Sequence, residues 1–199
     1  MYSLICSIFL CNADLSSSAI SQKLLKIASK GYEYSKSHNI THSPIMIIAD
    51  YSQASTNKRL WIINMETKKV LANSYVAHGL NSGSNFATRF SNNFASKKSS
   101  LGFFITQNHY IGSHGKSIKL KGLEKNINDN AFKRGVIIHS ASYVNEATID
   151  SLHRLGRSWG CLAVNKNTLH TILEHVTQPS LVLSYYPDSE WINSSRLLS

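Results

Sequence analysis

The chain has 199 residues, of which 42% are hydrophobic, and its 21 Lys and Arg against 11 Asp and Glu give a formal net charge of +10. This length fits one domain with at most a small appendage, and the hydrophobic fraction is sufficient for a single buried core. The basic charge favours polyanionic partners, but Lys and Arg are scattered and match no nucleic-acid-binding module, so we expect no nucleic acid partner.

The first predicted element is an export signal. Residues 4–10 are nearly all apolar, which is far short of the roughly 20 residues that a membrane-spanning helix needs, so we expect no membrane span. Cys11 and Ala13 precede Asp14 in a pattern that signal peptidase accepts. Residues 1–13 are therefore predicted to be a signal peptide of a periplasmic or secreted protein. A buried N-terminal strand is the alternative, because the segment lacks Lys and Arg.

The cysteine count adds to this interpretation. Cys6 and Cys11 lie inside the predicted signal, so the mature chain would keep only Cys161. A single cysteine cannot form an internal disulfide, and a lone thiol in an oxidising compartment is a liability unless it is used. Export thus favours Cys161 as a reactive residue.

The remaining pattern predicts a mainly β domain, a β-rich α+β fold. Residues 14–43 form a helical lead-in, with Ile20, Leu24 and Ile27 on one face. Two short helices are predicted at 145–155 and 165–176, and residues 187–199 are expected to be a C-terminal tail. Short apolar or alternating runs predict the strands, at 44–50, 59–65, 69–77, 101–106, 117–123, 135–140 and 181–186.

The stretch GRSWGCLAV, residues 156–164, contains two candidate nucleophiles. Ser158 lies in a G-x-S-x-G pattern, but a serine hydrolase needs a strand before that serine and then an acid and a histidine in that order. The preceding residues are predicted to be helical, and His170 and His175 both lie on the helix predicted at 165–176. The serine hydrolase interpretation is therefore rejected.

Cys161 has better-placed partners. His139 ends a strongly apolar strand upstream, at the rim where a base could reach a thiol. Gly160 permits close approach of a substrate carbonyl, and backbone N–H groups before the following helix could bind an oxyanion. Arg157 adds a positive charge that would favour the thiolate. The alternative is that Cys161 is a small buried apolar residue and His139 a core histidine.

Three blocks in order, SLGFF at 100–104, HS at 139–140 and SWGC at 158–161, resemble the murein L,D-transpeptidase catalytic domain family, which is YkuD-like. The blocks at 76–83 and 123–131 also resemble it, and the likeness spans about residues 44–186. The resemblance implies an L,D-transpeptidase-like β-sandwich or barrel as the catalytic domain, and no cofactor.

The resemblance also implies the site. By position, Cys161 would be the nucleophile and His139 the base, with Ser140 orienting that histidine. Gly160 and Cys161 N–H groups would hold the oxyanion. The expected reaction is attack on the L-centre carbonyl of a peptidoglycan stem tetrapeptide, followed by transfer of the acyl group to an amine of a second stem.

Substrate contacts are expected around the same turn. Ala163 stands where many family members carry a basic residue, so the substrate carboxylate needs another cation, and the candidates are Arg157, Arg134 and Lys133. The predicted substrate-binding residues are Arg157, Ser158, Trp159 and His114, the last of these lining the cleft. We expect no metal, because His109 and His114 lack a third ligand at a suitable spacing.

Two other functions remain open from the sequence. The same scaffold could use water as acceptor and act as an L,D-carboxypeptidase or endopeptidase. Alternatively, the chain could be a non-catalytic basic module that binds the cell wall through its net charge of +10.

Overall fold

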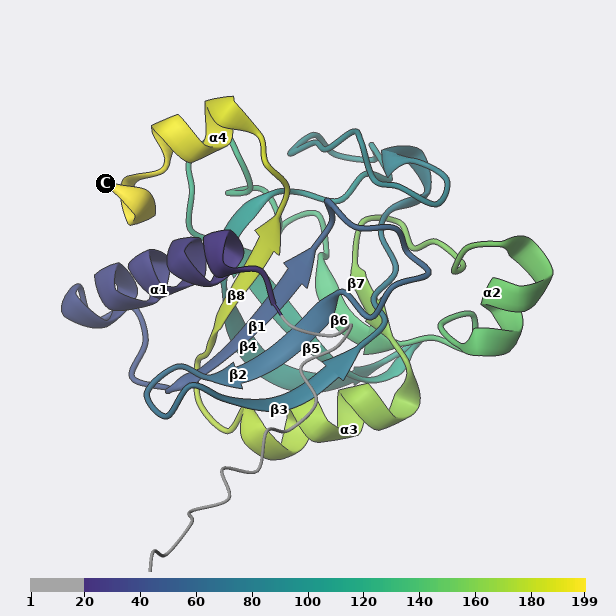
Figure 1. The fold of residues 1–199 in the computed structure, drawn as a ribbon, viewed down its shortest axis with the longest axis horizontal. Helices are drawn as coiled ribbons and strands as arrows, with labels where there is room; N and C mark the ends of the chain where they lie inside the picture. The colour runs from purple at the N-terminus through teal and green to yellow at the C-terminus, as the bar shows by residue number, and fades with distance from the viewer. Residues whose placement is uncertain (1–19) are drawn as a thin grey trace, which may run out of the picture.

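The computed structural model describes residues 20–199, so the predicted signal peptide lies outside the described residues. Eight strands form one mixed sheet in the order β3-β2-β1-β8-β4-β5-β6-β7, which curls into a nearly closed barrel (Figure 1). The strands are β1 (Ile45–Asp50), β2 (Leu60–Asn64), β3 (Lys69–Ser74), β4 (Gly102–Gly112), β5 (Gly115–Gly122), β6 (Ile137–Ser140), β7 (Leu162–Val164) and β8 (Leu181–Tyr185). The expected mainly β fold is confirmed.

The two ends of the sheet meet next to Cys161. β1 pairs with β8 and β6 with β7 in parallel, whereas the other neighbours are antiparallel. Beyond β3, the Ala77 N–H donates to the carbonyl oxygen of Ala163 in β7 at 2.9 Å. Strand β7 is absent from the sequence prediction, because three residues are too few to show a period.

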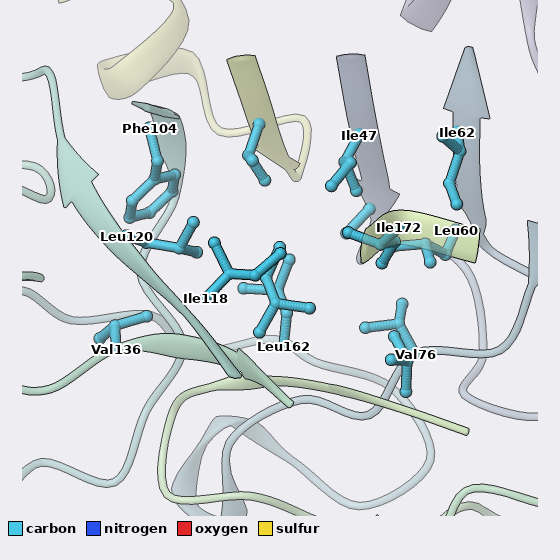
Figure 2. Close-up of a cluster of buried hydrophobic side chains, with 14 of the residues drawn as sticks. Ile47, Leu60, Ile62, Val76, Phe104, Ile118, Leu120, Val136, Leu162 and Ile172 are labelled. Carbon is cyan, nitrogen blue, oxygen red and sulfur yellow. The ribbon is translucent and has the colours of Figure 1, made fainter. Parts of the chain in front are cut away.

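The interior of the barrel is a continuous apolar core. Side chains from most strands converge there, and Ile172 of α3 (Lys166–His175) fills the space between them (Figure 2). Each fully buried Ile, Leu or Phe of this kind stabilises the fold by about 1.5–3 kcal/mol. The labelled members are Ile47, Leu60, Ile62, Val76, Phe104, Ile118, Leu120, Val136, Leu162 and Ile172.

The helical lead-in is α1 (Gln22–Ser37), which covers the outer face of the sheet beside β8 and β1 (Figure 1). It begins after Ser21, whose Oγ accepts the Leu24 N–H at 3.2 Å and so caps the first turn. Gly31 allows the helix to lie close to the sheet, because a Cβ there would come within 2.2 Å of the Phe103 ring. Strand β1 is therefore buried on both faces.

The two other predicted helices are α2 (Glu146–Leu152) and α3, and the predicted C-terminal tail, residues 187–199, is largely helical. They form α4 (Ser189–Ser194) and a 3-10 turn (Arg196–Leu198) that packs against α1. Trp191 is buried and donates its Nε1–H to Glu124 at 3.1 Å. The apolar residues of α4 are too sparse to show a helical period in the sequence.

No helix within residues 20–199 is long and apolar enough to cross a membrane.

Candidate active site

The turn that carries Cys161 is fixed by its own hydrogen bonds. The Ser158 hydroxyl accepts the Gly160 N–H at 3.1 Å and donates to the Cys161 carbonyl oxygen at 2.7 Å. Gly160 has φ +116°, a conformation that residues with a side chain rarely adopt. Ser158 is buried, and its hydroxyl holds the turn together through these two hydrogen bonds. The Gly160 N–H therefore already has an acceptor in the resting turn.

The segment after β3 clamps the turn from one side. The Ser158 N–H donates to the His78 carbonyl oxygen at 2.9 Å, and the Leu80 N–H donates to the Ser158 carbonyl oxygen at 2.7 Å. Behind this contact, the Arg59 guanidinium donates to His78 Nδ1 at 2.8 Å. Burial and the charge of Arg59 lower the pKa of His78 to about 4, so His78 is neutral.

Arg59 and His78 were not among the predicted site residues. Both are buried, and Arg59 also donates to the Val76 carbonyl oxygen at 3.0 Å and the Gln53 carbonyl oxygen at 2.7 Å. The only sequence signal was the family-like block at 76–83, which contains His78. Arg59 and His78 brace the backbone on which the Cys161 turn rests.

The Cys161 thiol lies beside the start of β6. Its Sγ is 3.7 Å from the Gly135 carbonyl oxygen, and the residue is partly exposed. Burial of the sulfur raises the pKa of Cys161, while a hydrogen bond from the Ile137 backbone and the charge of Arg134 lower it. Because burial is the largest cause, the resting sulfur is a neutral thiol that needs a base.

The prediction that Arg157 favours the thiolate is wrong. The Arg157 guanidinium donates to the carbonyl oxygens of Leu80 at 3.3 Å and Gly83 at 3.0 Å. The cation whose charge acts on Cys161 is instead Arg134. Proximity in sequence was misleading here, because the turn directs the Arg157 side chain towards residues 80–83.

His139 is held in the form that a base requires. Its Nδ1 lies 2.9 Å from the Ser140 carbonyl oxygen, and since a carbonyl can only accept, Nδ1 carries the proton and Nε2 is the free acceptor. Burial lowers the pKa of His139, and the charge of His114 lowers it further, so the ring is neutral near pH 7. Ser140 thus orients the ring through its backbone rather than its hydroxyl.

Register places His139 and Cys161 on one face of the sheet. His139 pairs with Ala163 across the parallel strands β6 and β7, and Cys161 immediately precedes β7. The Cys161 side chain contacts the Ile137 backbone, and alternate residues of a strand point the same way, so His139 projects from the same face as Ile137. Ile138 and Leu162 point into the core on the opposite face.

His114 and Trp159 also lie around this face. His114 is at the tip of the β4–β5 hairpin, and its ring stacks on His139 with centroids 4.3 Å apart. Trp159 is 74% exposed, and the Lys97 ammonium lies 4.6 Å from the centre of its ring. Lys133 is exposed on the turn before β6.

Two tyrosines that the sequence motifs did not reveal interact electrostatically with Cys161. Burial raises the pKa of both Tyr51 and Tyr143 to about 12, and the charge of Cys161 adds to the shift in each. Both phenols are therefore protonated near pH 7.

Within residues 20–199, no group of three or more His, Cys, Asp and Glu side chains could hold a metal ion. A thiol and a neutral imidazole on the same face of a sheet are the two groups that nucleophilic acyl transfer by cysteine requires.

The model of the L,D-transpeptidase catalytic domain family matches residues 16–185. No curated protein matches the chain. Among solved structures, an L,D-transpeptidase from Mycobacterium smegmatis is 12% identical, with a TM-score of 0.46, and the match covers 72% of this chain and 59% of that one.

Two further solved structures give similar values. An L,D-transpeptidase from Stackebrandtia nassauensis is 13% identical with a TM-score of 0.43, and the match covers 75% of this chain and 58% of that one. L,D-transpeptidase 1 from Mycobacterium tuberculosis is 12% identical with a TM-score of 0.42, with coverages of 72% and 62%. The chain thus spans about 60% of the length of these proteins. On the strength of the family model, which matches most of its length, the chain belongs to the L,D-transpeptidase catalytic domain family.

Proposed function

We propose that this protein is a cysteine-dependent peptidoglycan L,D-transpeptidase that acts outside the cytoplasm, in the periplasm or after secretion. Its partners are peptidoglycan stem peptides. The observation that carries the proposal is His139, held neutral with Nδ1 donating to Ser140, on the face of β6 that Cys161 adjoins. Family membership supports the substrate class.

The reaction follows from these protonation states. The Cys161 proton passes to His139 Nε2, and the thiolate forms a bond to the L-centre carbonyl carbon of a stem tetrapeptide. The tetrahedral intermediate collapses, the C–N bond breaks, and D-Ala leaves with the proton from His139. An amine of a second stem then attacks the thioester and gives its proton to His139, which returns it to the Cys161 sulfur.

The oxyanion of each tetrahedral intermediate would be bound by the backbone N–H groups of Cys161 and Gly160. The Gly160 N–H donates to Ser158 Oγ in the resting turn. During the reaction this N–H would therefore be shared between two acceptors, Ser158 Oγ and the oxyanion. Ser158 therefore has two proposed roles, holding the turn and lying beside the bound stem. Arg157, Trp159 and His114 are proposed to contact the substrate at the rim.

The direct test is product analysis. Purified protein is incubated with disaccharide-tetrapeptide, and the products are identified by mass spectrometry. We expect free D-Ala together with a cross-linked dimer. Tripeptide alone, with acceptor stems in excess, would identify an L,D-carboxypeptidase, and cleavage of existing cross-links an endopeptidase. Binding to sacculi without any product would identify the non-catalytic wall-binding module.

Trp159 supplies a sharper test of transfer against hydrolysis. Its exposed indole, two residues before Cys161, could exclude water from the thioester and line the path of the acceptor amine. Trp159→Ala should still release D-Ala, but the ratio of dimer to tripeptide should fall several-fold. Leu152→Ala is the matched control, because Leu152 is 51% exposed on α2 and has no proposed role in the site. An unchanged ratio in the folded variant would remove Trp159 from the acceptor side.

A further inference from the structure

Arg134 makes an unusual set of contacts in the turn before β6. One guanidinium nitrogen donates to the Ser91 carbonyl oxygen at 2.7 Å and to the Ser100 hydroxyl. The other donates to the Ser96 hydroxyl at 3.1 Å and to the Lys98 carbonyl oxygen at 2.8 Å. All four acceptors are neutral.

The positive charge of Arg134 has no carboxylate beside it. Within residues 20–199 the ion pairs are Lys36 with Glu66 and His170 with Glu174, and neither involves Arg134. The side chain is partly buried, so its charge is only partly screened by water. Its two terminal nitrogens are committed to the protein, which leaves little capacity for the bidentate binding of a substrate carboxylate.

The segment that Arg134 binds, residues 91–100, lies directly against the nucleophile turn. A Cβ at Gly160 would come within 2.6 Å of the Lys98 carbonyl oxygen and 3.4 Å of the Arg134 guanidinium. The same segment is joined to the clamp after β3, because the Gly79 N–H donates to Ser99 Oγ at 3.0 Å. Arg134 therefore fixes a surface on which the Gly160 backbone rests.

Arg134 also has an electrostatic relation to the thiol. Its charge lowers the pKa of Cys161, and Cys161 in turn raises the pKa of Arg134, which burial lowers. The other titratable groups around the thiol are the phenols of Tyr51 and Tyr143 and the His139 ring, with His114 stacked behind it. The two phenols and the His139 ring are uncharged near pH 7, so the fixed positive charge that acts on the thiol is that of Arg134.

We propose that Arg134 is a positioning residue that acts through Cys161: its guanidinium holds the Lys98 carbonyl against Gly160, and its charge stabilises the thiolate as it forms. This inference rests on the proposed role of Cys161 as the nucleophile. If Arg134 has this role, a cation other than Arg134 binds the substrate carboxylate.

The test separates charge from hydrogen-bonding geometry. Arg134→Lys keeps the charge but loses the planar fork, whereas Arg134→Gln loses the charge. The matched control is Lys69→Gln, because Lys69 is exposed at the start of β3 and has no proposed role in the site. The measurement is the rate of alkylation of Cys161 by iodoacetamide against pH, followed on the Cys161 peptide by mass spectrometry.

Arg134→Gln should move the alkylation midpoint of Cys161 upward by about one pH unit, because a nearby positive charge that favours the thiolate is removed. Arg134→Lys should keep the midpoint within about 0.3 units, since the charge remains. Its kcat for D-Ala release should nevertheless fall about tenfold with KM unchanged, because the Gly160 turn loses its support. Lys69→Gln should change neither quantity.

Several results would overturn the proposal. One is an unchanged midpoint in folded Arg134→Gln, and another is an equal shift in both variants of Arg134. A rise in KM with unchanged kcat in both would instead assign Arg134 to the substrate carboxylate. If Arg134→Gln does not fold, Ser96→Ala tests the hydrogen-bonding geometry alone. This variant should lower kcat without moving the alkylation midpoint of Cys161. An unchanged kcat would contradict the proposal. Alkylation needs no peptidoglycan, so failure of the proposed activity would be seen separately.

Discussion

Cys161→Ala should abolish D-Ala release and dimer formation, with a loss of about 10⁴-fold or more, because no other described side chain can form the thioester. Within residues 20–199 Cys161 is the free cysteine, and it immediately precedes β7, which pairs with the strand that carries the neutral His139. Removing the sulfur should leave the fold intact. Cys161 is partly exposed and lies outside the apolar interior of the barrel.

The measurement is the rate of D-Ala release, together with the intact mass of the protein during turnover. Wild-type protein should show the added mass of an acyl group, and Cys161→Ala should show none. Thermal unfolding of both proteins serves as the control for folding. Turnover of the variant near the wild-type rate would rule out the cysteine mechanism.

His139→Ala should lower the rate of D-Ala release by about 10²–10⁴-fold, because the raised pKa of Cys161 leaves a neutral thiol that depends on the base. The pH profile should change as well. In the wild type, activity should rise with pH through the lowered pKa of His139, since only the neutral imidazole accepts a proton. In the variant this step disappears, and reactivity should appear only as pH approaches the raised pKa of Cys161.

Alkylation of Cys161 near neutral pH, measured across a pH series, tests this without substrate. His139→Ala should be slower than wild type, with its profile displaced upward. His170→Ala is the matched control, because His170 is exposed on α3 and pairs with Glu174 at 3.2 Å. An identical profile in His139→Ala and wild type would show that His139 has a structural role alone.

Most of the fold could be predicted from the sequence because its signals are local. The seven expected strands are all present, since runs such as residues 44–50 and 181–186 are mostly apolar, and the strands they form, β1 and β8, are buried on both faces. The start of α2 is set locally as well, because the Asn145 side chain accepts the Thr148 N–H at 2.7 Å. Strand β7 and α4 were missed because their apolar residues are too few to show a period.

For the site, the sequence alone singled out Cys161 and His139 by residue type, order and a family-like setting. Only the tertiary structure decided how they are supported. The parallel register of β6 and β7 brings His139 to the face that Cys161 adjoins, and closure of the barrel at Ala77 brings His78 under the turn.

The same long-range contacts decided which cation acts on the thiol. Arg157 is close to Cys161 in sequence but donates to Leu80 and Gly83, whereas Arg134, which precedes β6, lies against Gly160. Side-chain direction after a tight turn and pairing between distant strands leave no periodic trace in the sequence. Composition, periodicity and motif order therefore determined the fold class and singled out Cys161 and His139, while strand register and barrel closure determined the face on which they lie, the burial that raises the pKa of Cys161 and the charge that acts on it.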